Sequence, residues 1–189
     1  MLAENTNLNF QEKFLNFFKK NLKTIILISI FIILTIIGLL FYKNLKEKKD
    51  ILVSEMYIEA TILLKQNQNN EAKNVLENVI NKNNKFYSPL ALYFIIDNNL
   101  ENSSEKIINY FDQILKIKNI DKDHVNLIKI KKAIYLFKFG SEEQIIKTLN
   151  PVINSESSWR VMAINLISEY FVSKGQKVKA DEYLKLLNN

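Results

Sequence analysis

The chain has 189 residues, a net charge of +6 at neutral pH and no cysteine, which excludes disulfide bonds and thiolate metal sites. With only three glycines and two prolines, the composition favours helices over a turn-rich β fold. Most of the basic excess flanks residues 24–42: residues 1–23 carry +2 and residues 43–50 carry +2, whereas the remaining 18 basic and 16 acidic residues carry only +2. A nucleic-acid-binding protein would gather basic charge on one face of its domain, so we expect no nucleic acid among the partners.

Residues 1–23 are expected to form a short cytoplasmic tail with an amphipathic segment. Phe10, Phe14, Phe17 and Phe18 recur there at helical spacing, with lysines and Glu12 between them. A helix lying at a membrane interface fits this pattern, and so does a cytosolic continuation of the next helix. Both interpretations place the aromatic rings near lipid head groups.

Residues 24–42 are the most apolar stretch and are expected to be a transmembrane helix. They contain eight Ile, four Leu, two Phe and no charge. As a helix they reach about 28 Å, close to the roughly 30 Å hydrocarbon thickness of a bilayer. A cleaved signal peptide fits less well, because Phe41-Tyr42 runs directly into Lys43 without a small-residue cleavage site. A buried core helix would need protein around its whole circumference.

The charges beside this stretch do not fix its orientation. Four lysines precede it, and four follow in the basic juxtamembrane segment, residues 43–50. The positive-inside rule therefore gives a tie. A short tail before a large C-terminal domain is compatible with a cytoplasmic N-terminus but does not prove it.

Residues 51–189 are expected to form one helical domain. Eight amphipathic segments are separated by short polar breaks, and none has the alternation of a half-buried strand. Several segments begin with capping residues: Ser103 or Ser104, Asp121 or Asp123, Ser157 or Ser158, and Ser141 with Gln144 at capping-box spacing. The expected helices are 52–64, 71–80, 89–96, 105–117, 125–139, 145–153, 159–173 and 176–187.

The eight segments form four pairs with a regular spacing. In the second helix of each pair, a small or apolar residue is followed four positions later by a larger one, at 72/76, 107/111, 145/149 and 180/184. The separations of 35, 38 and 35 residues are close to the 34-residue period of a tetratricopeptide repeat. We therefore expect an all-α chain in which one N-terminal transmembrane helix is followed by an α-solenoid of about four tetratricopeptide-like helix pairs. An ordinary helical bundle with chance spacing is the alternative.

Small residues at these positions would let paired helices approach closely, and larger ones would fill the gap above them. Gly175 is expected to make the turn of the fourth unit. The second unit is interpreted as degenerate, because it lacks the glycine and the small residues. The candidate repeat-packing residues are Ala60, Ala72, Leu76, Ala133, Gly140, Leu149, Gly175, Ala180 and Leu184.

Three stretches in a fixed order resemble the YfgM-like family, the ancillary subunit of the SecYEG translocon. They are FLNFFKKN before the apolar stretch, VSEMYIEATILL after it, and LNPVINSESSWRVMAINLISEYFVSKG near the C-terminus. The resemblance implies a single-pass protein of the bacterial inner membrane, with a cytoplasmic N-terminus and a tetratricopeptide-like domain in the periplasm. It also implies the translocon and periplasmic chaperones or clients as protein partners.

The residues that could carry chemistry are scattered. His124 stands alone at a helix start, and one imidazole without cysteine does not make a usual zinc site. The adjacent acids at 142–143 and 181–182 point to different faces of a helix, so they are interpreted as solvated surface. We therefore expect no enzyme, no cofactor, no metal site and no small-molecule substrate. Trp159 with Arg160 is a candidate for partner binding or for packing between repeats, and packing is favoured.

These features predict a membrane-tethered scaffold for protein–protein interactions. Stacked helix pairs would present a surface to a peptide or unfolded segment, and the tether would raise their concentration near a membrane complex. The alternative is a structural assembly subunit of another cell-envelope membrane complex, with no client binding.

Overall fold

The computed structural model describes residues 3–188, and every regular element among them is helical. The first two residues of the expected tail and the side chain of Phe18 lie outside the described part. The chain divides into two compact units, Met1–Ile51 and Leu52–Asn189, which we call the N-terminal unit and the helical unit. The helices are α1 (Ala3–Lys65), α2 (Asn69–Asn81), α3 (Tyr87–Asp97), α4 (Ser104–Ile114), α5 (Lys122–Phe139), α6 (Glu142–Ile153), α7 (Arg160–Ser173), α8 (Lys177–Lys185) and the short 3₁₀ helix η1 (Leu186–Asn188).

Helix α1 has 63 residues and contains the apolar stretch 24–42. Its apolar part has a mean hydropathy of 3.0, and none of it is buried within the protein, so α1 is long and apolar enough to span a membrane. The hydroxyl of Thr35 donates to the Phe31 carbonyl at 2.8 Å, which satisfies a polar group within the helix itself. The sequence predicted a separate helix from Leu52, but α1 continues through 43–51, because this segment has no glycine or proline and is rich in helix-forming Lys, Leu and Glu.

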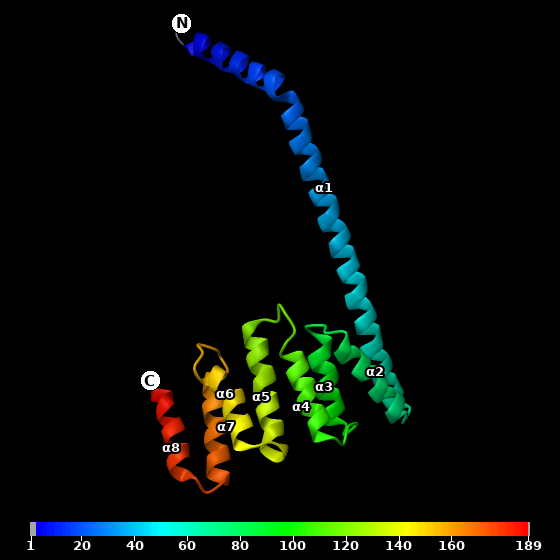
Figure 1. Cartoon of the computed structure of the whole chain (residues 1–189), viewed down its shortest axis with the longest axis vertical. Helices are drawn as coiled ribbons and strands as arrows, with labels where there is room; N and C mark the ends of the chain where they lie inside the picture. The colour runs from blue at the N-terminus through cyan, green and yellow to red at the C-terminus, as the bar shows by residue number, and fades with distance from the viewer. Residues whose placement is uncertain (1–2, 189) are drawn as a thin grey trace. The chain divides into compact units, whose positions relative to one another are not determined.

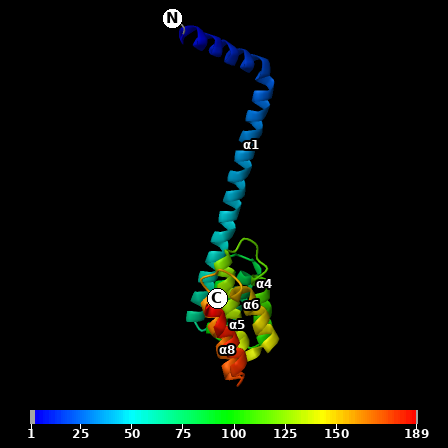
Figure 2. The same cartoon turned by 90° about the vertical axis from the view of Figure 1, so that its left-hand side faces the viewer.

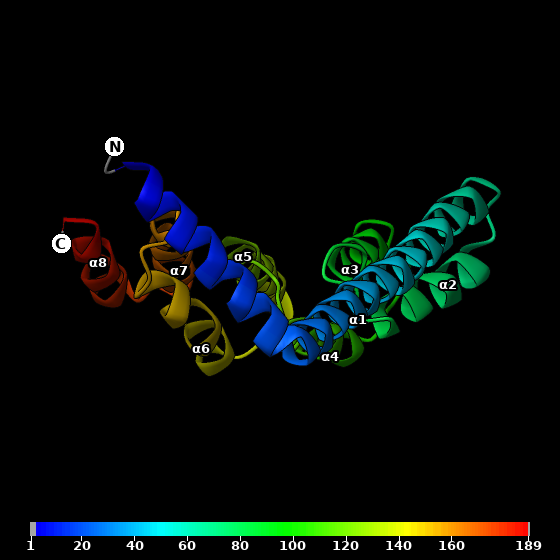
Figure 3. The same cartoon turned by 90° about the horizontal axis from the view of Figure 1, so that it is seen from above.

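In the helical unit, each helix from α2 to α8 contacts the next one, and α5 also contacts α7. They stand side by side as a row (Figure 1), and α4, α5, α6 and α8 overlap when the row is viewed from its end (Figure 2). Seen from above, α3, α5 and α7 lie along one side of the row, and α2, α4 and α6 lie along the other (Figure 3). We call these the odd side and the even side.

Two apolar cores lie between these helices. The first joins the end of α1 to α2, α3 and α4, and the second joins α5, α6, α7 and α8. Helix α5 contributes to both, because its Ile128 packs into the first core and its Ile130 into the second. The end of α1 is anchored by buried Val53 and Ala60, and the Tyr87 hydroxyl donates to Ser54 Oγ at 2.8 Å.

Side-chain caps start several helices, as the sequence predicted. Ser103 Oγ accepts from Lys106 N, and Asp121 accepts from Asp123 N. The predicted capping box at Ser141 is confirmed, since Ser141 Oγ accepts from Gln144 N and Gln144 Oε1 accepts from Ser141 N. The predicted cap at Ser157 or Ser158 is wrong. Helix α7 begins at Arg160 with Trp159 as the capping residue and no side-chain cap, and Ser157 Oγ instead accepts from Trp159 N and donates to Asp123.

Asparagine ends two helices in the way that Gly175 ends α7. Gly175 has a φ of +73°, and Asn67 and Asn99 have φ values of +60° and +52° at the ends of α1 and α3. The left-handed region suits glycine, and asparagine tolerates it better than most other residues. The connections after α1 and α3 therefore have the turn that the sequence predicted at Gly175. In each of the three turns, the backbone N–H of the residue after the left-handed one donates to a carbonyl of the last helical turn. These bonds are Gln68 N to Leu63 O (3.0 Å), Leu100 N to Ile95 O (3.0 Å) and Gln176 N to Phe171 O (2.9 Å).

The candidate repeat-packing residues differ in burial. Gly140 is partly buried and extended, Gly175 lies exposed in its turn, and Leu184 is 38% exposed. The prediction that Leu184 fills the gap next to Ala180 is wrong. Tyr183 does so, with its ring stacked on that of Phe171 and the ring centres 5.6 Å apart. In this short helix the residue three positions after Ala180 faces inward, rather than the residue four positions after it. The others have no exposed surface: Ala60, Ala72, Leu76, Ala133, Leu149 and Ala180.

Candidate interaction surface

A stripe of exposed residues runs along α5 on the odd side of the row. Lys131, Ile134 and Lys138 recur at helical spacing, and Ile134 is 46% exposed. The remaining faces of α5 bury Ile130 and Leu136 against neighbouring helices. The exposed face therefore points away from α4 and α6, and it combines an apolar side chain with two ammonium groups. We call it the α5 stripe.

Aromatic rings lie beneath both ammonium groups of the α5 stripe. Lys131 Nζ is 5.6 Å from the ring centre of Tyr93 on α3, and Lys138 Nζ is 5.1 Å from that of Phe139. Burial raises the pKa of Tyr93 to about 12. A ring face attracts a cation, and the contact between Lys131 and Tyr93 links α3 to α5.

A groove lies on the exposed face of α7. Its cavity volume is about 400 Å³. Val161 and Met162 are 54% and 43% exposed, so the walls of the groove are apolar. Glu169 is its one charged lining residue. We call it the Trp159 groove; its lining residues are Ser158, Trp159, Val161, Met162, Asn165, Leu166 and Glu169.

Trp159 and Arg160, which the sequence grouped together, have different positions. Arg160 Nε donates to Ile153 O at 3.1 Å, and its Nη2 donates to Leu186 O at 2.7 Å. Its guanidinium therefore ties α7 to the end of α6 and to η1, which is a packing role. Trp159 packs partly against the second core and also lines the groove, so it has both packing contacts and a surface.

An ion-pair network joins α2 to α4. Glu101 accepts from Lys73 at 2.8 Å and from Lys106 at 3.2 Å, and Lys106 also contacts Glu77 at 2.7 Å. The Lys73 ammonium, followed by the Ser103 N–H, lowers the pKa of Glu101 to about 2. Hydrogen bonding to Glu77 raises the pKa of Lys106 in turn. Because each charge has a partner, we interpret the network as a structural clamp.

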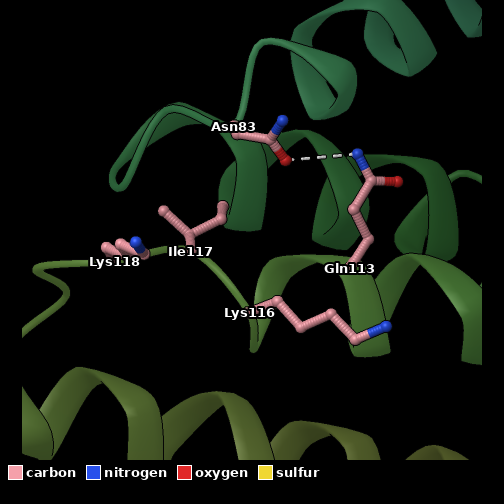
Figure 4. A pocket seen from close by; sticks show the side chains of 5 residues that line it. All are labelled: Asn83, Gln113, Lys116, Ile117 and Lys118. Atoms are coloured by element: carbon pink, nitrogen blue, oxygen red, sulfur yellow. Dashed lines mark hydrogen bonds between the residues drawn. The ribbon is translucent and has the colours of Figure 1, made fainter.

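A second hollow of about 540 Å³ lies where the loops after α2 and α4 meet. Gln113 and Asn83 lie close together there, and Gln113 Nε2 donates to Asn83 Oδ1 at 3.3 Å (Figure 4). Lys116 and Lys118, both exposed, also line it. Its lining has no acid, and two exposed lysines alone do not define a binding geometry.

The titratable residues noted in the sequence lie apart. The His124 side chain is 73% exposed, and its Nδ1 is 3.8 Å from Asp121. Glu142 pairs with Lys179 at 2.9 Å, which lowers the pKa of Glu142, whereas Asp181 and Glu182 are exposed. Among residues 3–188, no three His, Asp or Glu side chains gather as a group that could hold a metal ion.

The sequence missed both the α5 stripe and the Trp159 groove. Lys131 and Ile134 are recognisable as a surface only once the residues of α5 that face the two cores are known. The sequence pattern of one helix does not show which of its faces are covered by neighbouring helices. The signal at Trp159 was visible, but Met162 and Glu169 complete the groove at separations of one to three turns. Comparison with protein-family models, with curated proteins and with solved structures finds no match to this chain.

Proposed function

We propose that this chain is a membrane-anchored scaffold whose odd side binds segments of other proteins. The observation that carries the proposal is that two helices of the odd side leave apolar side chains uncovered beside charged groups: Ile134 on α5, and Val161 and Met162 on α7. Uncovered apolar side chains grouped with polar ones are typical of interaction surfaces. The Trp159 groove has one titratable lining residue, Glu169, and the ion-pair network at Glu101 is interpreted as structural, so we infer a binding protein rather than an enzyme.

The anchor and the helix pairs support this function in different ways. An uncovered apolar helix of this length suits a single-pass span, with the helical unit held at one membrane face. We further propose that the pairs form a tetratricopeptide-like solenoid. The repeated left-handed turns at Asn67, Asn99 and Gly175 support this, as do the fully buried Ala72, Leu76 and Ala180.

Through its resemblance to the YfgM-like family, we propose that the helical unit lies in the periplasm and serves the protein-export translocon at the bacterial inner membrane. Protease treatment of spheroplasts tests the orientation. Digestion of the helical unit from outside is expected, and protection would reverse the topology and exclude periplasmic clients.

Photocrosslinking in native membranes tests the binding surface. A photoreactive residue replaces Ile134 or Met162 on the odd side, and the matched control replaces Lys147, which is exposed on α6. Crosslinks to proteins passing through the membrane are expected from the first two positions and not from Lys147. Equal crosslinking from all three positions would refute a binding surface on the odd side.

A structural assembly subunit of an envelope complex is the second candidate, because uncovered apolar side chains also suit a permanent partner. The same crosslinks distinguish the two functions. Clients would be varied and would disappear when protein synthesis is blocked, whereas a permanent partner would be one protein crosslinked at constant yield.

A further inference from the structure

We propose that the Trp159 groove binds an apolar side chain of an extended peptide that carries a lysine or arginine next to it, with Glu169 pairing with that cation. This inference rests on the proposed binding function and names the chemistry of the segment that is bound. It concerns α7 and the two residues before it, where an apolar wall, an amide and a carboxylate occur together.

The groove is held in shape before anything binds. Arg160 fixes the first turn of α7 through its hydrogen bonds to Ile153 and Leu186. Trp159 is held by its contact with the second core. A preformed wall reduces the ordering cost of binding, and the unbranched Met162 can adjust to side chains of different shape.

The size and lining of the groove select an apolar side chain. A volume of about 400 Å³ lies at the lower end of small ligand sites and accommodates one large side chain with its flanking backbone. The side chains of Val161 and Met162 expose apolar surface to water, and binding of an apolar side chain would bury that surface.

The polar groups of the groove select the rest of the segment. The Asn165 and Glu169 side chains make no hydrogen bond or ion pair with any residue in the described range 3–188. An asparagine amide can donate to and accept from a peptide backbone. Glu169 is the only charge in the lining, so a basic neighbour is attracted and an acidic one repelled. For the same reason an anionic membrane surface is a poor occupant.

The chain contains one tryptophan, so emission from Trp159 reports directly on the groove. The full-length protein in detergent is titrated with an 11-residue peptide that has one central leucine between two lysines. Two matched peptides replace either the lysines by glutamates or the leucine by serine. A saturable change in emission is expected with the leucine–lysine peptide, with much weaker binding of both matched peptides.

Two variants test the assigned charge. Glu169→Gln should weaken binding of the leucine–lysine peptide about 2- to 5-fold, as expected for an exposed charge pair, and the effect should diminish at high salt. Glu169→Lys should make the glutamate peptide the better ligand. Glu59→Lys makes the same charge change at an exposed position of α1 and should leave the ranking unchanged. Equal thermal unfolding of the three variants controls for misfolding.

The outcomes separate this inference from the proposed function. If Glu169→Lys leaves the peptide ranking unchanged while Met162 still crosslinks clients in membranes, the charge selection is wrong and the binding surface stands. If the serine peptide binds as well as the leucine peptide, the apolar site is wrong. An emission change that follows protein concentration without any peptide would identify a second copy of the chain as the occupant and overturn the proposal.

Discussion

The guanidinium of Arg160 reaches the carbonyl oxygen of Leu186, 26 residues further along the chain, at 2.7 Å. The same side chain donates to Ile153 O, so one residue closes the ends of α6 and α8 over the first turn of α7. Both acceptors are helix-end carbonyls, which lack partners within their own helices. The C-terminal end of the helical unit therefore depends on a charged side chain as well as on apolar contacts.

Replacing Arg160 by alanine removes both of these hydrogen bonds. Hydrogen bonds to charged groups contribute about 1.5–3 kcal/mol each, but Arg160 is only partly buried and water can replace part of what is lost, so we expect the free energy of unfolding to fall by roughly 2–3 kcal/mol in total. Amide hydrogen exchange should accelerate first in α8 and η1. Arg160→Lys should recover only part of the loss, since one ammonium cannot reproduce the planar fork. Unchanged exchange in α8 would contradict the closing role.

Substitutions at Asn99 test the left-handed turn. Asn99→Ala should lower the free energy of unfolding by about 1 kcal/mol, because a φ of +52° strains an alanine. Asn99→Gly should match or exceed the stability of the original chain. Asn109→Ala, at an exposed position within α4, is the control and should cost nothing. Urea denaturation measures all three, and equal effects of alanine and glycine at position 99 would argue against the turn.

Two glycines should resist substitution for different reasons. A Cβ at Gly140 would lie 2.5 Å from Leu136 Cδ2 and 2.8 Å from Leu136 Cβ, and Leu136 is fully buried, so Gly140→Ala should cost about 1–3 kcal/mol. At Gly175 there is open space, but the φ of +73° makes alanine unfavourable by about 1 kcal/mol. Leu136→Ala should relieve only the Cδ2 contact of Gly140→Ala, because the 2.8 Å contact with the Cβ of residue 136 remains, and it should relieve none of the strain at Gly175. Double-mutant cycles in urea check this difference.

The Glu101 network predicts a dependence of stability on pH. The pKa of Glu101 is lowered from 4.5 to about 2 in the folded protein, so its ionised form stabilises the fold. This contribution is fully present above about pH 4.5 and is lost as the pH falls towards 2. We expect Glu101→Gln to cost roughly 1–2 kcal/mol at pH 7 and almost nothing near pH 2. Glu105→Gln, at an exposed position of α4, should show no such convergence.

Local patterns predicted the helices well, because their signals lie within a few residues. The capping box at Ser141 and the apolar spacing at 72/76 depend only on neighbours along the chain. The continuity of α1 was missed because polar residues at 43–50 resemble a break, although nothing in them stops a helix. The turns at Asn67 and Asn99 were missed because asparagine is common in this chain and only its φ shows its role.

The candidate site was harder to predict, because it consists of what the cores leave uncovered. Leu184 and Tyr183 are both large and adjacent, and only the packing of α8 against Phe171 decides which one faces inward. Trp159 attracted attention by its residue type. Which of its sides is exposed depends on the packing of α7, and the neighbouring Arg160 is held in contacts elsewhere.

The shared position of α5 determines how the helical unit can come apart. With Ile128 in one core and Ile130 in the other, neither half can lose α5 without exposing its own interior. A fragment ending before Lys122 would lack the side chain that closes the first core, and a fragment beginning after Phe139 would lack an inner wall of the second. The two halves are therefore expected to unfold in a single thermal transition. A destabilising substitution in α5 should lower the stability of both the first core and the second core.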